Sequence, residues 1–398
     1  MAACIAIVAA VLIADPGSAA DPPEFHWTAS QGFLYSSGNN YIDGSGDGVW
    51  DFREYAVNAQ YEFADNWRVG AQLLGREYGS VGNDRVGLDW ALVNWHWRDW
   101  LGFKAGQIKV PFGLYHETRD MDALRTEILL PQGVYVEYLR EVLTADLGAA
   151  AYGAARWSGA GTILYQLQAG ERQMDPDDGD LQRLMAESNI EIEDFSAHKP
   201  GITAMLRFLP EALQGLRLGA TYSIYDYTAE GAVASSPVSI PLRVEVRDNE
   251  FATCSIEYSL GNVTAAAEGM WSRYSSGAYV SGAEAPMAEW TDEFSGYYFR
   301  CGYRFLDRVE AATGYSYFDA TDGMNAARAF APGAPPRPSH TLEQTDIYFS
   351  LRYDATDNLI FKVEHHWLDG TAGIFEGENP DGVEERSRLL AMKAAVVF

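Results

Sequence analysis

The sequence offers almost nothing that could cross a membrane as a helix. Of its 398 residues, only residues 2–14 (AACIAIVAAVLIA) form a long apolar run. That run is shorter than the roughly 20 residues that a transmembrane helix needs. No later stretch contains 18 consecutive apolar residues. A membrane protein of this sequence would have to span the bilayer with strands, because only helices and closed barrels satisfy every backbone polar group in lipid.

The apolar run is followed by small residues at Gly17, Ser18, Ala19 and Ala20. Small residues after a short apolar segment are what a signal peptidase accepts. No Lys or Arg precedes the run, which is unusual for such a signal. The sequence predicts an export signal at residues 1–20 and a single domain at residues 21–398.

Cysteine and basic residues are scarce. Cys4 falls in the predicted signal, and Cys254 and Cys301 are predicted to face outward from second-neighbour strands, so we expect no disulfide. The chain has 29 Lys and Arg against 56 Asp and Glu, a net charge of -27. This balance argues against nucleic acid as a partner, because a phosphate backbone is bound by basic surface. Acidic loops that face the medium would explain the negative charge. The alternative is that the charge only keeps a soluble protein in solution.

Motifs for catalysis are missing as well. The sequence has no P-loop, no dinucleotide fingerprint and no G-x-S-x-G, and Ser350 and His366 are offset across their predicted hairpin. His365 and His366 point to opposite faces of one strand and cannot chelate together. Residues Asp175–Asp180 lack the full spacing of a calcium loop, which leaves only a weak ion site open there. We expect no enzyme, no cofactor and no metal site, with a barrel hydrolase or a closed structural or adhesive barrel as the alternatives.

Glycine and aromatic residues, in contrast, are plentiful: 38 Gly, 23 Tyr, 18 Phe and 11 Trp. Such a composition suits strands, turns and interfacial aromatic girdles. Residues 51–63, 216–224 and 297–305 each alternate between apolar residues on one face and polar or small residues on the other. One face suits lipid and the other suits water. A soluble sandwich can show the same alternation.

The lengths of the connections separate these two folds. Sixteen strands are predicted, at residues 25–35, 51–63, 67–78, 85–97, 101–110, 145–157, 162–171, 200–208, 216–227, 247–259, 262–273, 295–305, 309–318, 345–354, 359–368 and 386–398. Short turns alternate with long segments between them, which is the rule of outer-membrane barrels with short periplasmic turns and long external loops. The chain also ends on an aromatic residue, Phe398, within a strand. We therefore predict an all-β, transmembrane antiparallel β-barrel of about 16 strands in the bacterial outer membrane.

One segment carries a more specific pattern. It is the run Gly106, Gln107, Ile108, Lys109, Val110, Pro111, Phe112 and Gly113. Pro111 cannot donate to a β-ladder and should end a strand, and Gly113 allows a sharp turn. The segment resembles the G-x-x-K-x-P-F-G sequence that leads into the third loop of the phosphate-selective porin O and P family. The resemblance implies a third loop folded into the barrel, a homotrimer and the passage of small anions, although this chain has no Lys- or Arg-rich run.

Residues 114–144 form the predicted third loop, the longest connection, and they are too apolar for a solvent-exposed loop. We predict that the loop folds inward and that the pore constriction is formed by Arg119, Arg125, Asp120 and Asp122. Salt bridges that merely hold the loop are the alternative role for the two arginines. The predicted basic pore wall consists of Arg68, Arg76, Arg217, Arg300, Arg304, Arg352, Lys362 and Lys393.

These features predict a water-filled channel for passive diffusion of small hydrophilic solutes, with a possible preference for phosphate or other small anions. The expected partners are outer-membrane lipid and lipopolysaccharide, the barrel-assembly machinery and further copies of the chain in a homotrimer.

Overall fold

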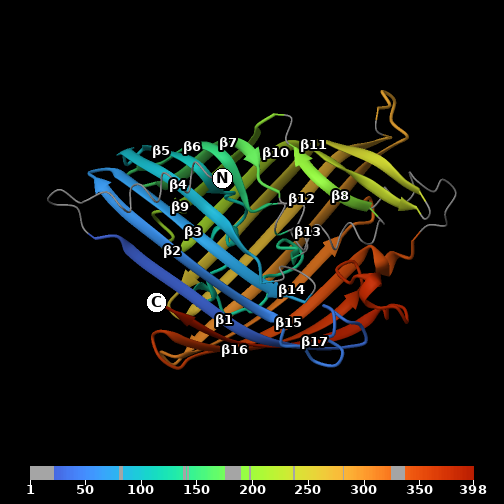
Figure 1. The fold of residues 1–398 in the computed structure, drawn as a ribbon. Coiled ribbons are helices and arrows are strands. Elements are labelled where there is room, and N and C mark those ends of the chain that lie inside the picture. The colour runs from blue at the N-terminus through green and yellow to red at the C-terminus, as the bar shows by residue number, and fades with distance from the viewer. Residues whose placement is uncertain are drawn as a thin grey trace.

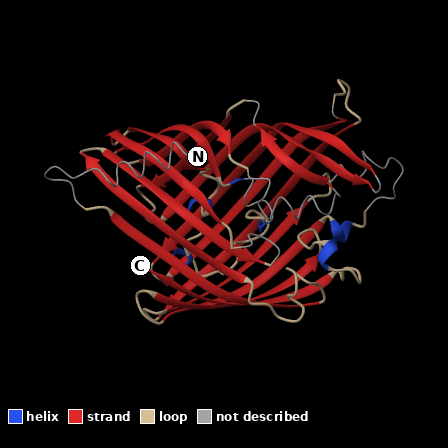
Figure 2. Cartoon of the chain, viewed as in Figure 1, coloured by secondary structure: helices blue, strands red, loops and turns tan. Residues whose placement is uncertain are grey.

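The computed structural model describes residues 22–79, 84–137, 140, 143–174, 190–196, 199–235, 238–280, 282–323 and 337–398. Nearly all the regular structure in this part of the chain is β-strand (Figure 2). The helical segments are single 3₁₀ turns: η1 (His116–Thr118), η2 (Asp122–Leu124), η5 (Ser339–Thr341) and η6 (Glu376–Glu378). No helix in the described ranges is long and apolar enough to cross a membrane.

The strands form one antiparallel sheet. They are β1 (Glu24–Ser37), β2 (Phe52–Ala64), β3 (Trp67–Tyr78), β4 (Val86–Arg98), β5 (Leu101–Lys109), β6 (Ala145–Trp157), β7 (Gly161–Arg172), β8 (Ile190–Ser196), β9 (Gly201–Pro210), β10 (Leu216–Ser235), β11 (Val238–Leu260), β12 (Val263–Val280), β13 (Ala288–Phe305), β14 (Val309–Asp319), β15 (Glu343–Asp354), β16 (Leu359–Gly370) and β17 (Arg386–Val397). Because β1 pairs with both β2 and β17, the sheet closes into a barrel of tilted strands (Figure 1). Sixteen strands make the closed wall, since β7 pairs directly with β9. The additional strand β8 pairs with the outer part of β10.

The two faces of the wall differ as the alternation predicts. Val57 and Phe299 on the outer face are 55% and 57% exposed, whereas Ser350 and Tyr298 on the inner face are fully buried. A closed ladder whose apolar side chains point outward meets the requirement for crossing lipid, because every strand has two partners. The predicted fold class is confirmed.

The first and last described strands, β1 and β17, close the barrel. The Trp27 amide donates to the Phe398 carbonyl oxygen at 2.8 Å, and the Phe398 amide donates back to Trp27 at 2.9 Å. The two aromatic rings stack with their centroids 4.6 Å apart. The predicted terminal strand therefore seals the barrel against β1. The predicted export signal lies outside the described residues.

Two parts of the strand prediction are wrong. The sequence predicts strands that end near residues 227 and 273, followed by long loops. Instead β10 continues to Ser235 and β11 begins at Val238. Likewise β12 continues to Val280 and β13 begins at Ala288. These strands run towards the upper right of Figure 1. For β10 and β11 the reason is a register shift between Tyr225 and Tyr227, after which these two strands resume pairing. β12 and β13 pair without a shift from Val263 to Ala278.

The described part of the third connection, residues 110–137, 140, 143 and 144, turns into the barrel as predicted. Its apolar side chains form two buried clusters with the inner wall. In one, Phe112 and Tyr135 pack with wall residues that include Phe251 and Tyr298. In the other, Ile128 and Leu129 pack against residues of β1, β2 and β17. Packing these apolar side chains inside the barrel removes them from water, which is favourable.

Candidate functional site

The exit from β5 is shaped by the residues that carry the family resemblance. Gly106 has φ 131°, and a Cβ there would lie 2.2 Å from the Ala91 carbonyl oxygen, so no other residue fits. β5 ends at Lys109, two residues before Pro111. The Pro111 carbonyl oxygen accepts a hydrogen bond from Thr221 at 2.8 Å, and Gly113 has φ 60°. The predicted strand end and sharp turn are both present.

A cavity of about 710 Å³ lies between the loop and strands β2 to β5. Phe398 and Asn358 line it, so it reaches the end of the barrel where the short turns lie. We call this space the vestibule. Its wall combines amide side chains, aromatic rings and cations, and its other end is bounded by the loop residues Glu117, Asp120, Met121 and Ala123. Met121 is 41% exposed, so the loop offers an apolar side chain to this space.

The loop meets the vestibule wall through one bridging lysine. Lys109 Nζ lies 2.8 Å from a carboxylate oxygen of Asp89 on β4 and 2.8 Å from one of Asp120 on the loop. Gln72 on β3 donates to both carboxylates. Although burial alone would raise it, the neighbouring Lys109 lowers the pKa of Asp120. The loop is thereby tied to three neighbouring strands at one height.

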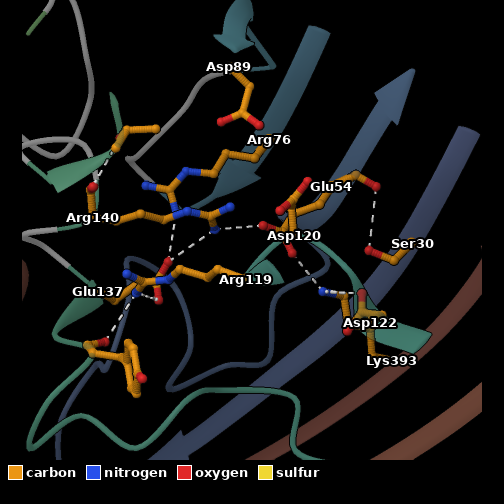
Figure 3. Close-up of polar contacts among 12 residues, drawn as sticks. Ser30, Glu54, Arg76, Asp89, Arg119, Asp120, Asp122, Glu137, Arg140 and Lys393 are labelled. Carbon is orange, nitrogen blue, oxygen red and sulfur yellow. Dashed lines mark hydrogen bonds and ion pairs between the residues drawn. The ribbon is translucent and has the colours of Figure 1, made fainter. Parts of the chain in front are cut away.

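Four arginines meet beside these contacts, and Figure 3 shows three of them, Arg76, Arg119 and Arg140. Arg119 and Arg76 lie 2.6 and 2.7 Å from the two oxygens of Glu137, and Arg140 lies 2.6 Å from Glu54. Together with Arg125 they line a cavity of about 20 Å³. Burial would raise the pKa of Glu137, but the surrounding guanidinium groups lower it to about 2. We call these residues, with Glu54 and Glu137, the arginine cluster.

Asp122 connects the next turn of the loop to strands on the far side of β1 and β2. It lies 3.1 Å from Lys362 on β16 and 2.8 Å from Lys393 on β17. Lys393 also lies 2.8 Å from Glu54, which joins this contact to the arginine cluster. Burial would raise the pKa of Asp122, and the two lysines lower it well below its ordinary value.

Backbone groups of the loop are held by wall side chains. Glu364 on β16 accepts hydrogen bonds from the amides of Ile128 and Leu129, each at 2.9 Å. Arg352 on β15 donates to the carbonyl oxygens of Ala123 and Arg125 at 2.6 and 3.2 Å. Since buried backbone groups must find partners, these side chains fix the path of a segment that has no strand partner of its own.

The predicted constriction residues come together on the loop but differ in role. Arg119 and Arg125 are nearly buried and line the small cavity of the arginine cluster. Asp120 lines the vestibule, whereas Asp122 is buried between two lysines. Arg119 forms the predicted kind of salt bridge, with Glu137. That Arg119 lines the narrowest point of a pore stays a prediction.

The predicted wall cations face inward, and most of them contact carboxylates or the loop. Arg300 lies 2.6 Å from Glu127 of the loop. Arg76, Arg352, Lys362 and Lys393 also hold the loop, as described above. Arg68, Arg217 and Arg304 pair with wall carboxylates, and of these Arg68 lines the vestibule. The wall therefore anchors the loop as much as it lines open space.

Several residues of the site were missed by sequence reasoning. Glu137 and Arg140 have the spacing of an ion pair, but nothing in the sequence joins them to Arg76 or Glu54. The sequence places Lys109 in the predicted exit motif but does not indicate that it bridges Asp89 and Asp120. Among the described residues, no group of three or more His, Cys, Asp and Glu could hold a metal ion. Residues Asp175–Asp180 lie outside the described ranges.

The fold is that of the outer-membrane porin barrels, with sixteen wall strands and a loop folded inside. Solved structures of this kind match the chain over nearly its whole length. The outer membrane channel DcaP of Acinetobacter baumannii matches with a TM-score of 0.58 and 11% identity, covering 96% of this chain and 98% of that one. OprB of Pseudomonas putida matches with a TM-score of 0.53 and 9% identity over 94% of both chains. An anion-selective porin from Comamonas acidovorans matches with a TM-score of 0.50 and 10% identity, covering 96% of this chain and all of that one.

No protein-family model matches the chain, and no curated protein matches it by sequence. At identities near 10%, the structural likeness establishes the barrel fold. The function has to be inferred from the residues of the site.

Proposed function

We propose that this protein is an outer-membrane porin, a channel for passive diffusion of small hydrophilic solutes. The observation that carries the proposal is a vestibule of about 710 Å³ inside a closed barrel whose outer face is apolar. Polar residues inside and aromatic residues outside are what a channel in lipid requires.

The preferred solutes are small anions. The loop that bounds the vestibule brings Arg119, Arg125 and Arg140 next to Arg76 of β3. Positive potential in a low-dielectric constriction favours anions and repels cations. Phosphate is one such anion, in line with the resemblance of the exit motif. Membership of the phosphate-selective porin O and P family is part of this proposal.

The remaining expectations belong to the same proposal. The chain is exported by a signal at residues 1–20, inserted by the barrel-assembly machinery and surrounded by outer-membrane lipid and lipopolysaccharide. It assembles as a homotrimer, as the family resemblance implies. The similarity to solved barrels named as porins or channels supports a non-enzymatic role.

A hydrolase is the weaker candidate. Ser350 donates to Glu364, while His366 contacts Asp346 and Glu364 at 2.9 Å. Ser350 is fully buried and Glu364 also holds the loop backbone, so these residues serve the anchoring of the loop.

Planar-bilayer recording of the purified protein tests the proposal. We expect discrete conductance steps, and in a KCl gradient a reversal potential displaced in the direction of chloride permeation. Phosphate should reduce the chloride current if it shares the path. A folded protein without conductance would favour a closed structural or adhesive barrel, and a potential of the opposite sign would leave a porin that prefers cations.

A further inference from the structure

The vestibule has an apolar side that a path for hydrated ions does not require. Trp90 and Leu92 of β4 and Ile108 of β5 line its wall, and the loop adds Met121 and Ala123. Met121 is 41% exposed, although an apolar side chain gains nothing by facing water. Together these residues offer a surface on which the apolar part of a solute can leave water.

The ring of Trp90 rests against the wall because a glycine makes room for it. Trp90 pairs with Gln72 of β3, yet its outer ring atoms lie over Gly70. A Cβ at Gly70 would stand 3.0 Å from Cζ3 and 3.1 Å from Cη2 of this ring. An aromatic ring held in this way can stack with a flat apolar group in the vestibule.

One cation of the vestibule differs from the others. The charged side chains around it are mostly paired: Arg68 with Glu62, Lys109 with Asp89 and Asp120, and Glu117 with Arg207. Asp357 is exposed in the turn between β15 and β16, at the opening. Lys104 of β5 has no carboxylate within 4 Å among the described residues, and its ammonium group donates to the neutral Gln166 at 3.1 Å. Glu117 and Arg207 act on Lys104 from further away and, as a pair, offset one another.

A chain of amide side chains holds Lys104 in place. Gln166 donates to Gln168 at 2.9 Å, and Gln168 donates to Asp146 at 2.9 Å. The Tyr152 ring lies on another side, with its centroid 5.1 Å from Lys104 Nζ. Since an ammonium group has three donors and Gln166 accepts from one of them, Lys104 keeps donors for an acceptor that comes from the vestibule.

The free cation and the ring face the same space. Lys104 pairs with Asn94, whereas the ring of Trp90 lies over Gly70, which pairs with Leu92. Asn94 and Leu92 are two residues apart on one face of β4, which corresponds to roughly 7 Å along the strand. This separation suits a molecule in which a carboxylate is attached directly to an aromatic ring.

We propose that Lys104 and Trp90 form a subsite of the vestibule for aromatic monocarboxylates, an inference that rests on the proposed function as a channel for small anions. The carboxylate accepts a hydrogen bond from Lys104, and the ring lies along Trp90 beside Met121. A second carboxylate on the solute would approach Glu117 or Asp120 of the loop, which also line this space. Phosphate has no apolar part and gains nothing from the apolar wall.

Blocking of the chloride current in a planar bilayer tests the subsite. We expect benzoate to reduce the current in a saturable manner, at about a tenfold lower concentration than acetate, because only benzoate has a ring to place on the apolar wall. Benzyl alcohol, which lacks the charge, should not block at these concentrations. Phosphate should block less than benzoate.

Two variants separate the charge from the ring. Lys104→Gln should raise the half-blocking concentration of benzoate by about tenfold, because it removes a charged hydrogen-bond donor. Trp90→Leu should bring benzoate close to acetate and leave the block by acetate unchanged. The matched control Arg386→Gln, which removes an exposed ion pair with Asp369, should be blocked by benzoate as the unaltered protein is.

Equal half-blocking concentrations for benzoate and acetate, a stronger block by phosphate, or an unchanged block in Lys104→Gln would overturn the subsite and leave the anion channel in place. A folded barrel without conductance would instead contradict the proposed function. Calorimetric titration of the protein in detergent then decides the subsite alone: saturable binding of benzoate in preference to acetate supports it, and no binding overturns it. If Lys104→Gln does not fold, Trp90→Leu and the comparison of solutes on the unaltered protein still decide.

Discussion

Two connections of this barrel begin on the same side of the wall and end differently. Residues 110–144 leave β5 and fold into the lumen, where Ile128, Leu129 and Tyr135 are buried. Residues 227–247 continue β10 and β11 as a long hairpin and stay in the wall. Both segments are partly apolar, so hydrophobicity alone does not decide which path a connection takes.

The difference lies in the partners available to the backbone. The hairpin keeps its two strands paired with each other past the register shift at Tyr225, so its backbone groups need no other element. The loop is interrupted by Pro111 and Pro131 and has no such ladder, and wall side chains such as Glu364 and Arg352 take the place of a neighbouring strand. An inward loop therefore depends on single buried side chains, whereas the hairpin depends on repeated backbone bonds.

We expect the largest difference between two variants that each remove one charge, one at a wall residue that holds the loop and one in the hairpin. Glu364→Gln takes the charge from a buried carboxylate that holds two loop amides and His366, and we expect a loss of roughly 3–5 kcal/mol. Glu245→Gln in the hairpin removes two partly exposed pairs, with Arg243 and Arg247, and should cost less than about 1 kcal/mol. Unfolding midpoints in denaturant measure both. Equal losses would mean that the loop is not held by its wall contacts.

A second pair of variants tests where the membrane ends along the hairpin. Leu218 faces outward near the start of β10, whereas Ile240 lies close to the far tip of β11. Leu218→Arg should hinder folding into lipid by roughly 1–2 kcal/mol, because Leu218 lies between the interface and the midplane, and Ile240→Arg should cost less than about 1 kcal/mol because the tip extends past the bilayer. Folding yield and stability in vesicles report the difference, with Leu218→Phe as an apolar control. Equal penalties would place the tip within the lipid.

Acid should loosen the loop before it affects the hairpin. The pKa of Glu137 is lowered from 4.5 to about 2, and that of Asp122 is lowered as well. Because both values are depressed on folding, their stabilising effect is present above about pH 4.5 and is lost as the pH falls towards 2. We expect the single-channel current to become noisier across this window. Glu137→Gln should remove part of the pH dependence, and an unchanged current down to pH 2 would contradict the role of these ion pairs.

The sequence predicts local features of this molecule well. Alternation identifies Val57, Leu218 and Phe299 as outward-facing, and all three are exposed in the barrel. Pro111 and Gly113 mark the strand end and turn where the loop leaves the wall. These features depend on residues within one strand or turn, so the pattern of neighbours is enough to define them.

Contacts between distant residues could not be predicted in this way. Lys393 and Asp122 lie 2.8 Å apart although 271 positions separate them, and no periodicity links them. Wall cations such as Arg300 and Lys362 were predicted from their inner face, but whether such a cation meets water or the loop depends on the path of the loop. The extension of β10 past residue 227 was missed because a register shift interrupts its alternation.

The account rests on the claim that the arginines of the inward loop control which ions pass. The most direct test is the reversal potential of the Arg119→Ala/Arg125→Ala double variant in a planar bilayer under a KCl gradient, beside the Arg119→Lys/Arg125→Lys variant, which keeps both charges. The account predicts that the anion-to-cation permeability ratio falls in the alanine variant and is largely retained in the lysine variant. A reversal potential unchanged by the alanine substitutions, in a barrel that remains folded, would contradict it and assign selectivity to the wall.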